Sequence, residues 1–135
     1  MDADVIAAKL ESLRRCISRV KARCPATAAA LATDVDAQDI VALNLSRAVQ
    51  LCVDLALHRI STGGDAAPTT MGGAFDTLAA SGTLDSALAK RMKSAVGFRN
   101  LAVHQYEAMD WAIVHAICTR RLDDFRMFAR VVADT

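Results

Sequence analysis

Aromatic residues are scarce in this chain. Only 4% of its 135 residues are Phe, Trp or Tyr, whereas 53% are hydrophobic. Because few large rings are available, the core has to be built from Ala, Leu, Val, Ile and Met, which favours helices packed closely through small side chains. No alternating pattern of apolar and polar residues is long enough to predict a strand.

Strong net charge and long apolar runs are also lacking. The formal net charge is +1, so composition alone does not support nonspecific binding to nucleic acid or to an anionic membrane. No uninterrupted apolar run approaches the roughly 20 residues that cross a bilayer. The N-terminal MDADVIAAKLESLRR lacks the basic-then-apolar order of a signal peptide. We expect a cytoplasmic protein with no membrane partner, in which any site for a polyanion is local.

The four cysteines, Cys16, Cys24, Cys52 and Cys118, form no Cys-x-x-Cys pair. Only Cys118, three residues after His115, lies near a histidine at a spacing that occurs in zinc sites. The pattern favours reduced and largely buried thiols over a structural zinc site. We expect His115 to be a hydrogen-bonded core or surface histidine and not a ligand.

Apolar residues recur at helical intervals along almost the whole chain. They predict helices over residues 4–22, 37–60, 70–79, from 85 into the stretch around 98–106, and 110–132, with a further turn of helix at 26–31. Pro25 and Gly63–Gly64 are predicted ends, and the candidates for N-caps are Thr33, Asp34, Asp36, Thr69, Thr70 and Asp85. The chain is therefore predicted to be one all-α domain over residues 1–135, a compact up-and-down bundle of four to five helices.

One polar cluster interrupts this pattern. The stretch FRNLAVHQY, residues 98–106, places Arg99, Asn100, His104 and Tyr106 on one half of an ideal helix. At about 100° per residue, Arg99 and His104 are nevertheless about 140° apart, too far to bind one small group as neighbours. Either the helix breaks nearby, or a second copy of the chain completes the site across a symmetric interface.

The residue types in this cluster suit RNA chemistry. Arginine binds phosphate with forked donors, histidine exchanges a proton near neutral pH, and tyrosine stacks or hydrogen-bonds. Together they supply what a metal-free ribonuclease needs, a base for the 2′-hydroxyl and a cation for the charge that develops on phosphorus-bound oxygens. From the residues alone, a capped and hydrogen-bonded helix end is the competing interpretation.

The cluster also carries a family resemblance. Arg99, His104 and Tyr106 match the R-x4-H-x-Y motif of HEPN-domain proteins, and RNLAVHQY resembles the corresponding segment of the HepT-like ribonuclease toxins. Further segments are similar to that family in the same order, namely KLESLRRCISRV, DIVALNLSRAVQLCVDLALH, PTTMGGAF and LDDFRMFARVV. The resemblance therefore covers nearly the whole chain.

The resemblance implies an all-helical homodimer of HEPN-like fold with the motifs in a cleft at the subunit interface. It implies a toxin that cleaves RNA, tRNA or mRNA, without a metal or cofactor. Arg99 would bind the scissile phosphate, His104 would be the general acid or base, and Tyr106 would contact the substrate. Tyr106 would also receive AMP from an MNT-type nucleotidyltransferase antitoxin. The alternative is a noncatalytic helical protein that binds nucleotide or a partner and pairs with such a nucleotidyltransferase.

Asn100 and Asp54 are candidate supporting residues. The Asn100 amide could orient His104 or contact RNA, or could make only a structural bond between residues four apart. Asp54, if buried, needs a cationic or hydrogen-bonded partner, for which Arg99 is our candidate. An exposed pair of Asp54 with His58 is the alternative.

A basic cluster precedes the motif. Lys90, Arg91 and Lys93 lie one or two turns before Arg99. They could steer an RNA backbone towards Arg99 despite the near-neutral total charge. A solvated helix face is the competing explanation.

Overall fold

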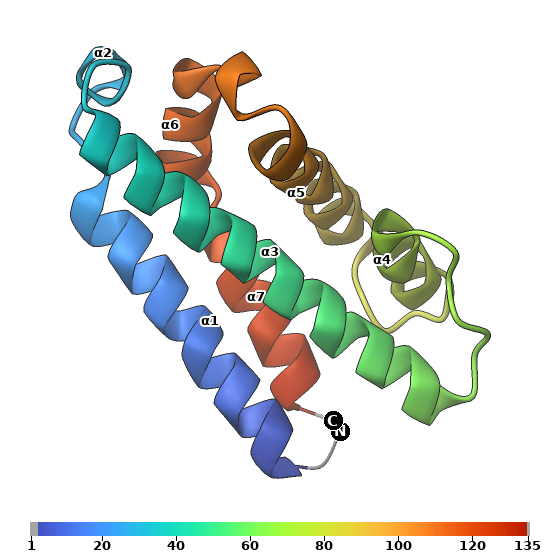
Figure 1. Ribbon diagram of the computed structural model, residues 1–135. Helices are drawn as coiled ribbons and strands as arrows, with labels where there is room; N and C mark the ends of the chain where they lie inside the picture. Colours follow the sequence, from blue (N-terminus) through green and yellow to red (C-terminus); the bar gives the residue numbers. More distant parts are fainter. Residues whose placement is uncertain (1–2, 135) are drawn as a thin grey trace.

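The computed structural model describes residues 3–134, so the outermost residues of the predicted 1–135 domain lie outside the described part, and that extent stays a prediction. Every regular element within the described part is helical (Figure 1). The elements are α1 Ala3–Arg23, α2 Ala28–Leu31, α3 Val35–Gly63, α4 Met71–Ala80, α5 Ser86–His104, the 3-10 turn η1 Tyr106–Ala108, α6 Trp111–Arg120 and α7 Leu122–Ala133. The predicted all-α bundle is confirmed.

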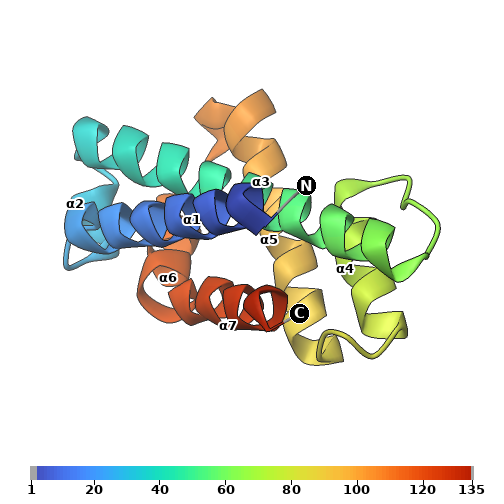
Figure 2. The same cartoon turned by 90° about the horizontal axis from the view of Figure 1, so that it is seen from below.

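Helix α3 is the centre of the bundle. It packs against α1, α4, α5 and α7, and Figures 1 and 2 show α1 lying along its length. By length and composition alone α3 could cross a membrane, but more than half of its apolar stretch is buried inside the protein. This burial is what a core helix requires, because a helix surrounded by other helices is apolar over most of its circumference.

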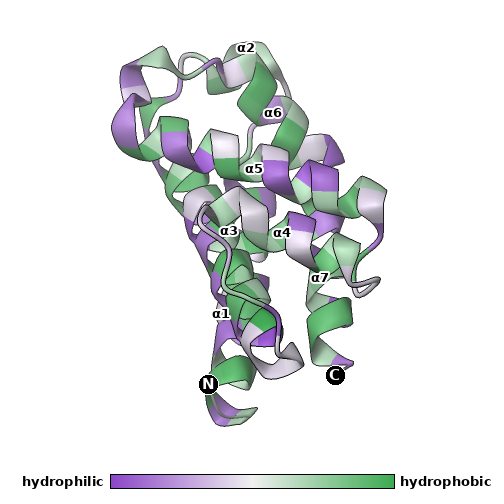
Figure 3. Cartoon of the chain, turned by 90° about the vertical axis from the view of Figure 1, so that its right-hand side faces the viewer, coloured by the Kyte–Doolittle hydropathy of each residue, from purple (hydrophilic) through white to green (hydrophobic). Residues whose placement is uncertain are grey.

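The core is built mainly from aliphatic and small side chains. One aromatic pair joins two distant helices, because the rings of Phe75 in α4 and Phe128 in α7 meet edge to face with centroids 5.5 Å apart. In Figure 3 hydrophobic and hydrophilic residues alternate along the helices, as expected for helices with one buried face.

The cysteines and His115 contribute to this packing. All four cysteines are free thiols; Cys16, Cys52 and Cys118 are buried and Cys24 is partly buried. His115 Nε2 lies 2.9 Å from the Pro25 carbonyl oxygen, which can only accept a hydrogen bond. The imidazole N–H therefore donates and ties α6 to the turn after α1, as predicted for a structural histidine.

Three helix starts use N-caps from the predicted candidates. The side chains of Asp34, Thr70 and Asp85 each accept a hydrogen bond from the backbone N–H three residues later. At the other end of α3, Gly64 adopts a left-handed conformation with φ 83°, which glycine reaches without the steric cost that a Cβ brings. Local sequence thus sets these boundaries.

The predicted single helix over residues 110–132 is wrong. The segment is divided into α6 and α7, and Arg121 between them has φ −121° and ψ 3°, outside the helical conformation. No Pro or Gly marks the break. Its cause is tertiary, because α6 packs against α2 while α7 packs against α3, α1 and α5, and one straight helix cannot follow both surfaces.

Candidate functional site

The polar cluster lies at the end of α5 and in the turn that follows. Asp85 caps the start of α5, and the helix continues unbroken through Gly97 to His104. Gln105, with φ −142° and ψ 53°, ends the helix, and η1 follows directly. The helix break that the sequence permitted therefore exists, but it comes after His104.

This position of the break leaves Arg99 and His104 on one continuous helix. Their separation of about 140° around the axis therefore remains. Arg99 is partly buried, and its Nη1 donates to Asn100 Oδ1 at 3.2 Å, whereas His104 is exposed. Among the described residues Asn100 thus contacts Arg99 and not His104. One copy of the chain does not bring the two candidate catalytic groups together.

Tyr106 has left the helix and contacts α3. Its hydroxyl donates to Asp39 Oδ1 at 2.6 Å, across 67 residues of sequence. Its ring meets the ring of Trp111 edge to face, with centroids 5.7 Å apart. Burial raises the pKa of the Tyr106 hydroxyl, and the hydrogen bond and negative charge of Asp39 raise it further. The phenol is therefore held in its neutral form.

Asp39 is the polar residue of this region that the sequence did not single out. It is an exposed residue in the second turn of α3, and acidic residues near a helix start are common because they offset the helix dipole. One signal was available: Asp39 is the first residue of the segment DIVALNLSRAVQLCVDLALH, which resembles the family. Its contact with Tyr106 depends on the turn after α5, which periodicity does not describe.

The prediction that Arg99 pairs with Asp54 is wrong. Asp54 accepts a hydrogen bond from Lys9 Nζ at 3.2 Å and another from Gln50 Nε2 at 3.0 Å. It follows Asp39 by 15 positions on α3, or about 22 Å along a helix that rises 1.5 Å per residue. The contact with Lys9 joins α1 to α3. Neither contact involves a residue of the motif, so they add no support for the predicted role of Asp54 at the candidate RNA site.

Two of the three residues in the basic cluster are paired with carboxylates. Arg91 Nε lies 3.0 Å from Asp124 Oδ1, and Lys93 Nζ lies 2.7 Å from Asp76 Oδ2. These pairs join α5 to α7 and to α4. Their charges are largely offset, which weakens the interpretation of this cluster as a path for an RNA backbone.

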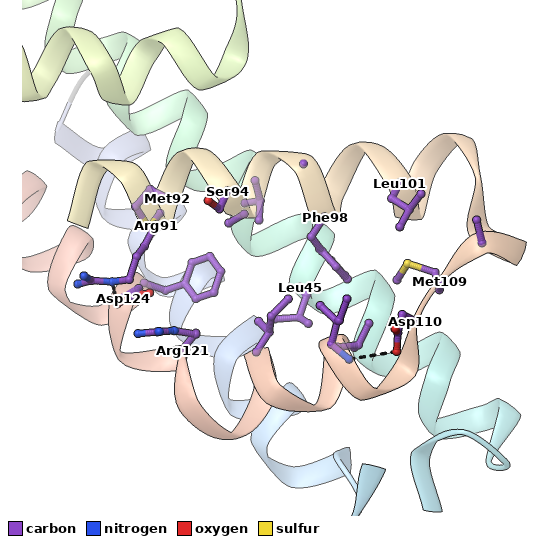
Figure 4. A pocket seen from close by; sticks show the side chains of 18 residues that line it. Leu45, Arg91, Met92, Ser94, Phe98, Leu101, Met109, Asp110, Arg121 and Asp124 are labelled. Atoms are coloured by element: carbon purple, nitrogen blue, oxygen red, sulfur yellow. Dashed lines mark hydrogen bonds and ion pairs between the residues drawn. The ribbon is translucent and has the colours of Figure 1, made fainter. Parts of the chain in front are cut away.

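A cavity of about 610 Å³ lies on another side of α5. In Figure 4, Arg91, Asp124 and Arg121 gather at one end of it and Met109 and Asp110 at the other. Phe98 and Leu101 line it from α5. On an ideal helix these two side chains point away from the half that carries the motif. The cavity is therefore separate from the polar cluster.

Exposed apolar side chains flank the polar cluster. Val103, between Arg99 and His104 on the surface of α5, is 53% exposed. On α3, Val35 and Leu43 lie one turn before and one turn after Asp39, and they are 64% and 55% exposed. Large apolar groups beside polar ones are typical of a surface that another protein covers.

Comparison with known proteins identifies the family to which the chain belongs. The model of the family described as ribonuclease HepT-like matches residues 13–132. The chain belongs to the HepT-like ribonuclease family. The matched range contains the whole polar cluster and Asp39, and the family predicted from the motif is confirmed.

Several known proteins resemble the chain over nearly their full length. The mRNA nuclease HepT of Shewanella oneidensis is 31% identical over 129 residues, which are 96% of each chain. The solved structure of the tri-AMPylated Shewanella oneidensis HEPN toxin in complex with MNT antitoxin matches with a TM-score of 0.91 and 30% identity over 100% of both chains. A toxin–antitoxin crystal structure with AMP-PNP matches with a TM-score of 0.89 and 30% identity, over 98% of this chain and 99% of that chain. The predicted HEPN-like fold is confirmed.

Proposed function

We propose that this HepT-like chain is the toxin of a toxin–antitoxin pair and acts in the cytoplasm as a metal-independent endoribonuclease on mRNA or tRNA. The observation that carries the proposal is the complete Arg99, His104 and Tyr106 motif on α5 and η1 of a chain that matches the ribonuclease family over residues 13–132. The relative named as an mRNA nuclease supports the substrate class.

The two helix residues divide the work of cleavage. His104 takes the proton of a ribose 2′-hydroxyl, whose oxygen forms a bond to the adjacent phosphorus while the bond from phosphorus to the 5′-oxygen breaks. The Arg99 guanidinium binds the non-bridging oxygens, where negative charge grows in the transition state. The departing 5′-oxygen takes up a proton from water, and His104 returns its proton to the solvent afterwards. The products are a 2′,3′-cyclic phosphate and a 5′-hydroxyl end, and no redox step or metal is required.

We infer that the working enzyme is a homodimer. Arg99 and His104 lie about 140° apart on a continuous helix, so a second subunit offers the route by which an arginine and a histidine bind one phosphate. Val103 is exposed between them and would be buried by a second α5 helix related by a two-fold axis. Arg99 of one protomer then faces His104 of its partner.

Regulation of the toxin is proposed to act at Tyr106. An MNT-type nucleotidyltransferase antitoxin would transfer AMP from ATP to its hydroxyl. The solved complex of a tri-AMPylated HEPN toxin with MNT antitoxin supports such a modification. The added phosphate is negative and bulky. Placed in the turn directly after α5, it would repel the RNA backbone and compete for Arg99.

The test uses the purified chain free of antitoxin, incubated with mRNA and tRNA in the presence of a chelator, followed by sequencing of the RNA ends. We expect discrete cuts that disappear in Arg99→Ala and His104→Ala and persist in His58→Ala, a histidine on α3 outside the cluster. Intact RNA with the unmodified wild-type chain would instead support a noncatalytic protein that only binds its nucleotidyltransferase.

A further inference from the structure

The contact between Asp39 and Tyr106 has no role in the cleavage chemistry described above. The hydroxyl hydrogen of Tyr106 points at Asp39 Oδ1, 2.6 Å away, a short distance typical of a hydrogen bond to a carboxylate. The lone pairs of the phenolic oxygen remain available to attack an electrophile. This is the arrangement of a nucleophile beside a base.

We propose that Asp39 is the general base for AMPylation of Tyr106. This inference rests on the proposed modification of Tyr106 by a nucleotidyltransferase. In the step, Tyr106 Oη forms a bond to the α-phosphorus of ATP, the bond from that phosphorus to the bridging oxygen of pyrophosphate breaks, and pyrophosphate leaves. The hydroxyl proton passes to Asp39 Oδ1.

A base is needed because the phenol of Tyr106 resists ionisation. Burial and the neighbouring carboxylate raise its pKa, so phenolate is scarce near neutral pH, and a neutral hydroxyl is a weak nucleophile. A carboxylate that accepts the proton while the new bond forms avoids free phenolate as an intermediate. The hydrogen bond to Asp39 thus keeps the Tyr106 hydroxyl neutral at rest and provides the acceptor for its proton during attack.

Of the groups around Tyr106, Asp39 is the one positioned to accept its proton. Trp111 of α6 touches the ring edge to face and has no ionisable group. His104 at the end of α5 and Glu107 in η1 are the nearest titratable residues in sequence, and both are exposed. Among the described residues, the carboxylate of Asp39 is the group hydrogen-bonded to the Tyr106 hydroxyl.

Asp39 also comes from a different element than its target. It lies on α3, the central helix, and Tyr106 lies in the short turn η1. Because α3 is fixed by contacts with α1, α4, α5 and α7, the carboxylate is held on a rigid element, while the ring of Tyr106 is oriented by Trp111. Rigid placement of base and nucleophile is what makes proton transfer efficient.

The experiment follows AMP addition to the full-length chain by its MNT-type nucleotidyltransferase and ATP, using intact mass against time. Asp39→Asn keeps an oxygen acceptor of the same shape but cannot take up the proton. We expect it to slow the first AMP addition by about 100-fold or more, the usual contribution of a general base, and Asp39→Glu to recover part of the rate. Asp36→Asn, an exposed acid one turn earlier on α3, is the matched control and should react as the wild type does.

A pH profile separates proton transfer from a structural effect. Without a base the reaction needs phenolate, so the rate of Asp39→Asn should rise about tenfold per pH unit through the neutral range and approach the wild-type rate at high pH. An Asp39→Asn rate equal to that of the wild type would overturn the proposal, as would a loss of rate that is the same at every pH. No AMP addition to the wild type, by contrast, would refute the proposed modification itself.

Discussion

Tyr106 is the residue whose environment departs most from what the sequence suggested. It is the one tyrosine in the chain, so the ultraviolet absorbance of phenolate reports on it alone. Burial is the first cause of its raised pKa and Asp39 the second. The two causes can therefore be separated by removing the carboxylate while the burial stays.

We predict that in the native protein this phenol titrates above the ordinary value of about 10. In Asp39→Ala the midpoint should fall but remain above about 10, because burial still disfavours the phenolate. The unfolded chain loses its phenol proton first as pH rises, so this group's contribution to stability is present below about pH 10 and is lost as pH rises through the raised native pKa. A midpoint in Asp39→Ala equal to that of the native protein would show that the contact does not exist in solution; Asp36→Ala is the control.

Residue types and spacing single out Arg99, His104 and Tyr106 as candidates, but they do not predict the contacts that these residues make. A helical wheel placed Tyr106 beside Arg99, whereas Gln105 ends the helix and turns Tyr106 towards Asp39. Arg99 was expected to pair with Asp54, which instead binds Lys9. Partners far apart in sequence depend on where helices end and cross, and one sequence does not contain that information.

At the scale of elements, local chemistry explains the helix starts and tertiary packing explains the exception. Asp34, Thr70 and Asp85 were identified from their residue types because a short polar side chain satisfies free N–H groups at a helix start. The division of the last helix at Arg121 was not identified, since the apolar pattern continues through it. Patterns of burial do not show a change of helix direction when both halves are buried.

Asp110 connects the start of α6 to the candidate site. Its Oδ1 accepts hydrogen bonds from the backbone N–H groups of Ala112 at 3.0 Å and Ile113 at 3.4 Å. The cap starts α6 directly before Trp111, whose ring touches Tyr106. We therefore expect the Asp110 cap also to hold the Tyr106 ring in its position against Trp111.

We predict that Asp110→Ala lowers the free energy of unfolding by about 1 kcal/mol, the usual cost of losing an N-cap. Asp110→Asn should retain most of that stability, because its amide oxygen can accept the same bonds. Urea unfolding measures the loss, and near-ultraviolet circular dichroism should show a weaker Tyr106–Trp111 signal in Asp110→Ala. Asp65→Ala, in the loop before α4, should leave both readouts unchanged; an equal loss there would show that the effect is not due to the cap.

At the scale of the whole molecule, one chain leaves the two candidate catalytic groups apart. The candidate acid–base group and the candidate phosphate-binding group lie on one continuous helix, on different edges, with the exposed Val103 between them. An exposed apolar side chain between two polar groups of a candidate site is expected where a second copy of the chain covers it. The arrangement predicts a site shared between two subunits. Mixing two different inactive variants can restore activity at a shared site, but not at a site formed within one chain.

We predict that mixing Arg99→Ala protein with His104→Ala protein, each inactive alone, restores RNA cleavage. In a mixed dimer one shared site lacks both residues and the other has both. Random exchange makes about half of the dimers mixed, so about a quarter of wild-type activity should return. The measurement is the cleavage rate after the two proteins are unfolded together and refolded as a mixture.

The control places a charge at the expected interface. Val103→Glu added to both variants should abolish the recovery by burying a carboxylate between the subunits, and light scattering should show monomers. Met127→Glu, on an exposed position of α7 that is 38% accessible, should leave the recovery intact. If mixing restored nothing while the wild type cleaved RNA as a dimer, each site would have to take Arg99 and His104 from the same chain. The two side chains would then have to move together on binding RNA, since the free α5 helix holds them on different edges.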